Sequence, residues 1–332
     1  TKSKINTYDA VDEVYGLGYA FIQFENEKEA EEALNQYKKQ GLTVQNDKLY
    51  NLNTVSTNAE GSDWAYTFSE ANVALDYFKS MDNPEIIVGI IDSGIDLNHT
   101  KLQNRIIRSY TNFASSTSEN SEMDNNGHGT NVAGVIAQST PDNVKISAFK
   151  VSDVENKVYT SSLICAYEYI LAMKENRPDI INMSYGGNGL DTPVERDLLS
   201  QLKDSGITLV ASAGNDNIDT KDVSPANNIN VLAVSAHDEN GNKCWFSNYG
   251  STVDIAAPGQ NVKTYTVGNS NSYEYVNGTS FSAPFVCAAA AYVLMQNETL
   301  KPDEVYEKMK LSAFDRKKPT DKKWAGSGLL NF

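Results

Sequence analysis

The sequence is poor in the residue types that build disulfide frameworks and metal centres. Its 332 residues include three cysteines and three histidines, which are Cys165, Cys244, Cys287, His99, His128 and His237. An odd number of cysteines argues against a disulfide framework, and neither set has the spacing of metal ligands. We therefore expect neither a disulfide-stabilised small domain nor a zinc centre.

Long apolar runs and positive charge are also scarce. The longest apolar run, around Phe285–Met295, falls short of the roughly 18 residues that a membrane span needs. Acidic residues outnumber basic ones by 43 to 28, for a net charge of −15. This charge argues against nucleic acid or an anionic membrane surface as a partner. The chain begins TKSKINTYDA, without a charged-then-apolar leader, although a signal peptide could already have been removed.

The residues that are present suffice for a large folded core. Apolar residues make up 40% of the chain, and the length suits one large domain with a smaller one. Strand-like segments alternate with helix-like ones, namely strands at 144–151, 179–185, 207–214 and 230–236 and helices at 161–176 and 193–206. Such alternation predicts an α/β fold, a doubly wound parallel sheet with helices on both faces.

Three polar residues lie where catalytic groups are useful. Ser280, in GTSFSAP, directly precedes an apolar run, so we expect it near a helix N-terminus, where backbone N–H groups stabilise an oxyanion. Asp92 ends the buried-strand pattern EIIVGIID, and His128 lies between glycines before a helical pattern. Each alone suits a cap or turn. Together they supply a nucleophile, a base and a group that orients the base.

The segments DSGID, GHGT and GTSFSAP, in this order, resemble those that carry the triad of subtilisin-like serine proteases. LVASAGND resembles the segment with their oxyanion asparagine, which would be Asn215. INMSYGG resembles the strand that lines their substrate cleft, here Ser184, Tyr185 and Gly186. The resemblance implies a subtilisin-like fold and cleavage of peptide bonds through an acyl-enzyme, with no cofactor required.

The first sixty residues have a different composition. GYAFIQFE alternates like a strand, residues 27–41 have the charge pattern of a helix, and residues 42–54 return to an extended pattern. This β-α-β unit could be an independent binding module. It also resembles the propeptide of subtilisin-like proteases, whose last strand runs through the cleft, and its position upstream favours this second interpretation.

We accordingly divide the chain into 1–57, a propeptide-like α+β domain; 58–82, a linker and the first segment of the next domain; and 83–332, a subtilisin-like catalytic domain. The polar stretch NTVSTNAEGSD has no apolar pattern. We expect the processing point between Leu52 and Asp63.

The segment after the helix that carries His128 is short. It passes through STPDNV directly into the next strand, with little room for the calcium loop that subtilisins commonly have there. Asp142 is its only candidate carboxylate ligand. The resemblance therefore implies no tight calcium site at this place and leaves a structural calcium ion elsewhere open.

The loop from Asn215 to Pro225 is short and carries Asp216, Asp219 and Asp222. In relatives this stretch lines the pocket for the residue before the scissile bond, where a carboxylate would select arginine or lysine. With the propeptide and the short calcium segment, it resembles the lantibiotic leader peptidases of the nisin and epidermin type. The ordinary alternative is that these are solvated loop carboxylates, with Asp219 and Asp222 the better placed for a pocket.

Other functions remain to be weighed. A general secreted subtilisin-like protease of broad specificity and a catalytically silent binding protein share the same scaffold. A dinucleotide-binding oxidoreductase is excluded because no G-x-G-x-x-G follows the strand that ends at Asp92. The resemblance places the protein outside a bacterial cell or at its surface, with a peptide, which could be a lantibiotic precursor, and its own propeptide as partners.

Overall fold

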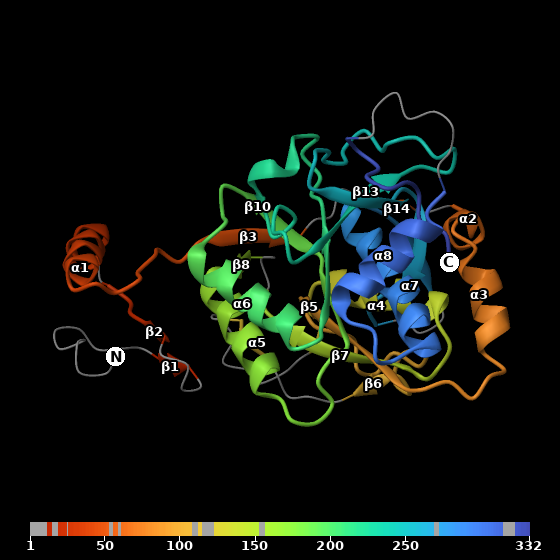
Figure 1. Cartoon of the computed structure of the whole chain (residues 1–332), viewed down its shortest axis with the longest axis horizontal. Helices are drawn as coiled ribbons and strands as arrows, with labels where there is room; N and C mark the ends of the chain where they lie inside the picture. The colour runs from red at the N-terminus through yellow and green to blue at the C-terminus, as the bar shows by residue number, and fades with distance from the viewer. Residues whose placement is uncertain are drawn as a thin grey trace.

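A parallel β-sheet forms the centre of the molecule (Figure 1). The computed structural model describes residues 12–14, 19–24, 26–52, 56–58, 61–107, 112–114, 123–152, 157–268, 272–314 and 323–332. The strand order in this sheet is β14 (Val253–Pro258), β13 (Leu232–His237), β11 (Thr208–Ser212), β9 (Ile180–Met183), β5 (Ile86–Asp92), β7 (Val144–Lys150), β6 (Ile106–Ile107). All neighbouring pairs are parallel, as the sequence predicted.

Helices cover both faces of this sheet (Figure 1). They are α2 (Trp64–Phe68), α3 (Ala71–Phe78), α4 (His128–Ser139), α5 (Thr160–Ala172), α6 (Pro193–Asp204), α7 (Ala283–Gln296) and α8 (Pro302–Ser312). Successive side chains of β5 point to opposite faces. Val88 and Ile90 pack in the core with α4 and α7, whereas Ile91 packs in the core with α5 and α6. The doubly wound α/β fold is confirmed.

The order of the strands fixes where a site can form. From β5 the chain crosses to β6 at one edge and comes back to β7 beside β5, and it then continues on the other side through β9, β11, β13 and β14. The sheet therefore has a switch point between β5 and β9, where loops leave in opposite directions and open a crevice. Asp92 ends β5 and Ser184 directly follows β9, so both lie at the carboxyl edge of this switch point.

Smaller antiparallel sheets surround the crevice. One has the order β12 (Val223–Ser224), β10 (Tyr185–Asn188), β3 (Leu49–Leu52), β8 (Lys157–Tyr159). The other has the order β15 (Val262–Tyr265), β16 (Tyr273–Asn277), β4 (Ser56–Asn58). Each of these two sheets includes one strand from the N-terminal segment. That segment also contains the pair β1 (Asp12–Val14) and β2 (Tyr19–Phe21) and the helix α1 (Glu27–Lys39).

The extended segment expected at 42–54 is shorter as a strand than the sequence suggested. Among its described residues it forms a strand at Leu49–Leu52, and the partners of this strand are β10 and β8. The sequence unit of strand, helix and strand is therefore not a single sheet. Local sequence carries no record of the β10 and β8 edges, and a strand beside Tyr185 and Gly186 is the arrangement that the resemblance implied.

Helix α7 is the central helix of one core layer. The window Thr279–Gln296 is long and apolar enough to cross a membrane by length and composition, but 89% of it is buried inside the protein. The sequence analysis missed this window because it considered uninterrupted apolar runs. Alanines 288–291 are buried and allow α7 to pack closely against the sheet and α4.

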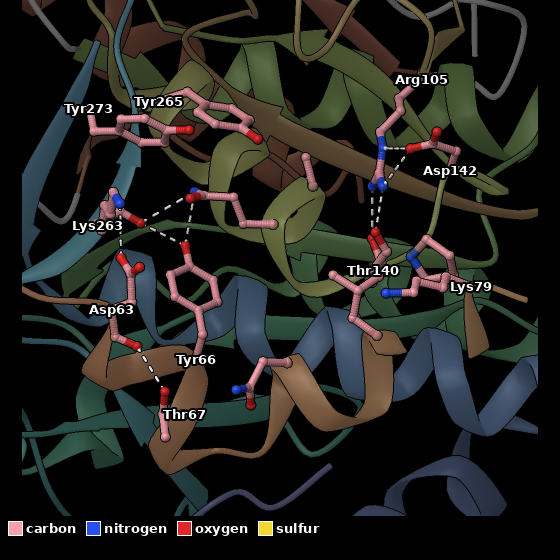
Figure 2. A pocket seen from close by; sticks show the side chains of 15 residues that line it. Asp63, Tyr66, Thr67, Lys79, Arg105, Thr140, Asp142, Lys263, Tyr265 and Tyr273 are labelled. Carbon is pink, nitrogen blue, oxygen red and sulfur yellow. Dashed lines mark hydrogen bonds and ion pairs between the residues drawn. The ribbon is translucent and has the colours of Figure 1, made fainter. Parts of the chain in front are cut away.

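A buried arginine supplies positive charge at the end of α4 (Figure 2). Arg105 donates from Nη1 to the Thr140 hydroxyl at 2.9 Å, from Nη2 to the Thr140 carbonyl, and from Nε to Asp142 at 3.1 Å. Thr140 is the C-cap of α4, where unpaired carbonyls favour a cation. Burial lowers the pKa of Arg105, and the hydrogen bond that Arg105 donates to Asp142 opposes this effect.

This arginine lies in the short segment where the sequence left little room for a calcium loop. Asp142, the candidate calcium ligand, instead pairs with Arg105 at 3.0 Å. Among the described residues, no group of three or more histidine, cysteine or acidic side chains could hold a metal ion. The calcium prediction itself stays a prediction.

We predict that Arg105→Met lowers the free energy of unfolding by about 1–3 kcal/mol, because the last turn of α4 loses its capping cation. Asp142→Asn, the matched control, should cost less because Asp142 is exposed. Urea denaturation with and without a chelator measures both effects. Equal stability of Arg105→Met and the parent would contradict the prediction, and a chelator effect on the parent would indicate calcium elsewhere.

Candidate active site

Asp92 lies at the carboxyl end of β5 and is fully buried. Its Oδ1 atom lies 2.7 Å from Nδ1 of His128 and accepts the Ser93 N–H at 2.7 Å. A carboxylate placed in this way fixes the orientation of the imidazole and favours the tautomer with its proton on Nδ1. The structure therefore brings together the first two residues of the predicted triad.

His128 begins α4, and two glycines make its position possible. Gly127, the N-cap, has φ +105°, a conformation that favours glycine. A Cβ on Gly129 would lie 2.0 Å from the Gly94 carbonyl oxygen and 3.3 Å from the Asp92 Cβ. Only glycine permits this approach, which lets the first turn of α4 lie against the loop after β5.

Asp124 ties these two segments together, and the sequence analysis missed it. Its Oδ1 accepts from the Ser93 hydroxyl at 2.9 Å and from the Gly127 N–H at 2.8 Å, and its Oδ2 accepts from the Thr130 N–H at 2.9 Å. Ser93 in turn accepts the Gly129 N–H at 2.9 Å. The sequence clue to this residue was an acidic side chain shortly before the histidine in DNNGHGT. We assign Asp124 as a positioning residue.

Ser280 lies in the 3₁₀ turn η3 (Thr279–Phe281), just before α7, as the sequence predicted. Its hydroxyl donates to the Ser184 carbonyl at 3.0 Å, and the Ser184 hydroxyl donates to the Ser280 carbonyl at 2.8 Å. The pair joins the nucleophile to the strand that follows β9. Ser280 is thereby held at the carboxyl edge of the sheet, beside Asp92.

The neighbouring serine, Ser282, is the N-cap of α7. Its hydroxyl donates to the carbonyls of Ala257 and Pro258 at 3.2 and 3.1 Å. This hydroxyl is therefore engaged in the core, which distinguishes Ser282 from Ser280.

The second ring nitrogen of His128 is available for proton transfer. Nε2 is buried and has no hydrogen-bond partner among the described residues. The imidazole ring lies 5.5 Å from the ring of Phe281, the residue after Ser280. In this structure the Ser280 hydroxyl donates to the Ser184 carbonyl and not to His128. Catalytic hydrogen bonds often form only when substrate is bound.

Asn215 follows β11 and is oriented by Thr279. Its Oδ1 atom accepts from the Thr279 N–H and the Thr279 hydroxyl, both at 2.9 Å. Because the oxygen of the amide faces Thr279, the Nδ2 donor is directed away from it. This arrangement suits a side chain that donates to an oxyanion next to Ser280. The sequence analysis quoted Thr279 within a motif but gave it no role.

This geometry agrees with a comparison of the whole chain with known families. The model of the subtilase family matches residues 83–328. The chain belongs to the subtilase family. Subtilases are subtilisin-like serine endopeptidases, and the arrangement of Asp92, His128 and Ser280 is consistent with that chemistry.

Curated subtilases resemble this chain over most of its length. Subtilisin DY of Bacillus licheniformis is 34% identical, and the match covers 74% of this chain and 88% of that protein. Subtilisin-like protease 5 of Arthroderma gypseum is 32% identical over 82% of this chain and 65% of that protein. The chain spans about half the length of some other fungal relatives, such as 51% of the Arthroderma otae protein.

Solved structures share the fold. The crystal structure of a cold-adapted subtilisin-like serine proteinase has a TM-score of 0.67 and 28% identity, and the match covers 77% of this chain and 91% of that one. A protease from Pseudoalteromonas arctica has a TM-score of 0.71 at 24% identity, and covers 81% and 94% of the two chains. At that identity the second likeness supports the fold alone.

In this subtilase the residues predicted to line the cleft form a β-sheet with a strand of the same chain. Strand β3 lies between β10 and β8, with Leu52 opposite Tyr185 and Asn51 opposite Gly186. β10 continues directly from Ser184, whose carbonyl accepts from Ser280. Of the residues predicted to bind substrate, Tyr185 and Gly186 therefore pair with the N-terminal segment, and Ser184 lies next to this pairing in the chain.

The same segment continues on the other side of Ser280. Strand β4 pairs with β16, with Ser56 opposite Asn277, and β16 leads through Gly278 into the turn that carries Ser280. Residues 53–55, within the predicted processing region, lie outside the described residues. The described strands thus flank the nucleophile from both sides.

The acidic loop lies close to the predicted pocket strand, but its recorded contacts are local. Asp219 is exposed and accepts the Lys221 N–H at 3.0 Å as the cap of a 3₁₀ turn. Asp222 is exposed, 4.0 Å from the Lys221 Nζ, and Asp216 is exposed as well. These surroundings are those of solvated loop carboxylates, so a role in specificity stays a prediction.

We predict that Asn215→Leu lowers kcat by roughly 10²- to 10³-fold with little change in KM, because an oxyanion donor acts in the transition state. Thr279→Val should cost about 10-fold, since Asn215 loses one of the groups that orient it, and Thr279→Ser should match the parent. Steady-state kinetics on a peptide substrate measures these changes. A large KM effect with kcat preserved would instead make Asn215 a binding residue.

Proposed function

We propose that this chain is a serine endopeptidase whose N-terminal segment is a prosegment that fills the cleft until it is cut. In the reaction the Ser280 hydroxyl attacks a peptide carbonyl while His128 Nε2 takes its proton. Asp92 stabilises the resulting imidazolium, and Asn215 with the Ser280 N–H donates to the oxyanion.

The remaining steps follow from the same residues. As the tetrahedral intermediate collapses, the C–N bond breaks and His128 donates its proton to the departing amine. Water then attacks the acyl-enzyme, with His128 as base, and releases the acid product and the Ser280 hydroxyl. No metal or cofactor takes part, and we propose none as a requirement.

The single observation that supports a prosegment is the pairing of β3 within the cleft and of β4 beyond Ser280. Further contacts anchor this segment. The Asp47 carboxylate accepts from the Ser161 N–H at 2.9 Å and from its hydroxyl at 2.6 Å, at the N-terminus of α5. An extended chain held in this way has the geometry of a peptide substrate. We propose 1–57 as prosegment, 58–82 as linker and first segment, and 83–332 as catalytic domain.

For the substrate we propose the leader of a lantibiotic precursor, cleaved after a basic residue by an enzyme outside a bacterial cell or at its surface. The support is the resemblance to leader peptidases and the three carboxylates between Asn215 and Pro225. The net charge of −15 agrees with a cationic substrate.

One observation favours the alternative, a general protease of broad specificity. If processing occurs between β3 and β4, the cut falls within the sequence from Leu52 to Ser56, LNTVS, which has no lysine or arginine. An enzyme that cuts there must accept an uncharged residue before the scissile bond. The two substrate classes therefore predict different peptide preferences.

We predict that the full chain cuts itself between Leu52 and Ser56 and that Ser280→Ala stays intact, since alanine has no nucleophile. Activity on added peptide should fall by up to about 10⁶-fold, as it does in subtilisin. Ser282→Ala, whose hydroxyl only bonds Ala257 and Pro258, is the matched control and should process normally. Mass spectrometry locates the cut. Processing of Ser280→Ala, or a fluorophosphonate label on Ser282, would disprove the assignment.

For specificity we predict that peptides varied only before the scissile bond are cut fastest with arginine. Asp222→Ala should reduce this preference more than Asp219→Ala, because the Asp219 carboxylate is engaged as a cap. If the guanidinium pairs with a desolvated carboxylate, the loss would be roughly 2–5 kcal/mol in transition-state binding. Equal kcat/KM for arginine, leucine and glutamate would favour the general protease. Arginine preference retained in both variants would exclude these residues as its cause.

A further inference from the structure

The cleft contains a deep slot that holds one side chain of β3. In this strand Tyr50 is fully buried, whereas Leu49 and Asn51 are exposed. The Tyr50 ring lies edge-on against Tyr185, with ring centroids 5.7 Å apart, and packs in the same core cluster as Val158 of β8. Among the β3 side chains, Tyr50 is therefore the main one that anchors this strand to the rest of the protein.

A carboxylate lies at the bottom of this slot. Glu195, in the first turn of α6, is 1% exposed. Its Oε2 atom accepts from the Tyr50 hydroxyl at 2.6 Å and from the Ser224 hydroxyl at 2.7 Å. Its Oε1 atom is buried and has no hydrogen-bond partner among the described residues. The slot is thus lined mainly by aromatic and aliphatic side chains, and a hydrogen-bond acceptor lies at its end.

Burial of this carboxylate is costly, so its position needs a reason. Burial raises the pKa of Glu195 to about 7, opposed by the hydrogen bonds from Tyr50 and Ser224. The positive end of α6 favours an acidic residue in its first turn. However, a helix satisfies this preference with exposed side chains, as α8 does with Asp303 and Glu304. The helix alone does not explain a side chain turned into the slot.

A tyrosine is the occupant that fits this chemistry. The ring packs against the aromatic and aliphatic lining, and the hydroxyl reaches both Glu195 and the Leu190 carbonyl, the latter at 3.2 Å. A phenylalanine would remove the Tyr50 hydrogen bond and leave Glu195 with the hydroxyls of Ser224 and Tyr167. A site with a buried acceptor discriminates strongly against a ligand that lacks the matching donor.

We propose that Glu195 makes this slot a specificity pocket for a tyrosine of the peptide substrate, at the position that Tyr50 takes in β3. The inference rests on the proposed function, because β3 must leave for a substrate to enter. It goes beyond that proposal by naming a second substrate side chain that the enzyme recognises, at a position away from the scissile bond. Glu195 binds the substrate here and takes no part in the chemical step.

The test uses the chain's own sequence as the probe. The peptide of residues 47–58, DKLYNLNTVSTN, carries a fluorophore and a quencher at its ends and is made with tyrosine, phenylalanine, leucine or lysine at position 50. The full chain is left to process itself, and active sites are counted with a fluorophosphonate. A chain that neither processes nor reacts would refute the proposed function itself.

We expect the parent to cleave the tyrosine peptide roughly 10- to 100-fold faster than the phenylalanine peptide in kcat/KM. Glu195→Met should bring this ratio to about one, and Glu195→Gln should retain part of it because the amide oxygen still accepts. Asp197→Asn, which removes a carboxylate from the exposed side of the same helix, is the control and should keep the parent ratio.

The ratio compares two peptides on one enzyme sample, so partial misfolding of a variant does not affect it. If active enzyme leaves every peptide uncut, the same ratio is taken from the inhibition of casein cleavage. Equal use of tyrosine and phenylalanine by the parent, an unchanged ratio in Glu195→Met, or a preference for lysine would each overturn the proposal.

Discussion

The hydrogen bond between His128 and Asp92 depends on an unusually close approach of two backbone segments. The first turn of α4 lies against the loop after β5, and Gly129 contacts the Gly94 carbonyl where no side chain fits. Asp124 and Ser93 hold this contact with buried hydrogen bonds. A shift of about 1 Å in such a site is costly to catalysis. Backbone packing therefore sets the positions of the triad residues, and the orientations of their side chains depend on it.

The parallel sheet gives this contact its rigid support. β5 is buried on both faces and lies at the switch point, with Asp92 at its end. On the opposite side of the crevice, α7 packs against the sheet and carries η3 before its first turn. Ser184 then links the nucleophile to the strand after β9 through two hydrogen bonds. The three triad residues thus come from separate elements of one core, so that their distances are fixed by its packing.

The sequence predicted the parts of this structure that depend on local pattern. The strand that ends at Asp92 and the helix start at Ser280 follow from periodicity and composition, and the order of the motifs indicated the family. The register of β3 between β10 and β8 could not be predicted from local pattern, because it depends on edges formed by segments more than a hundred residues away, and only the resemblance implied a strand in the cleft. Glu195 was not identified either, since an acidic residue in a first helical turn ordinarily faces solvent. Asp219 shows the converse, a loop carboxylate whose local capping contact competes with any role in a pocket.

The pairing of β3 and β4 also bears on how a filled cleft could open. While the chain is continuous, each strand holds the other near its site, and this linkage raises the effective concentration of both. A cut between Leu52 and Ser56 removes the linkage, so β3 and β4 then dissociate independently. The segment with β3 retains the Tyr50 anchor and the Asp47 contacts with α5, whereas β4 pairs, among the described strands, with the edge of β16 alone. The N-terminal product should therefore leave more slowly than the new end of the catalytic domain, and Glu195, by retaining Tyr50, would link substrate selection to the rate at which the cleft becomes free.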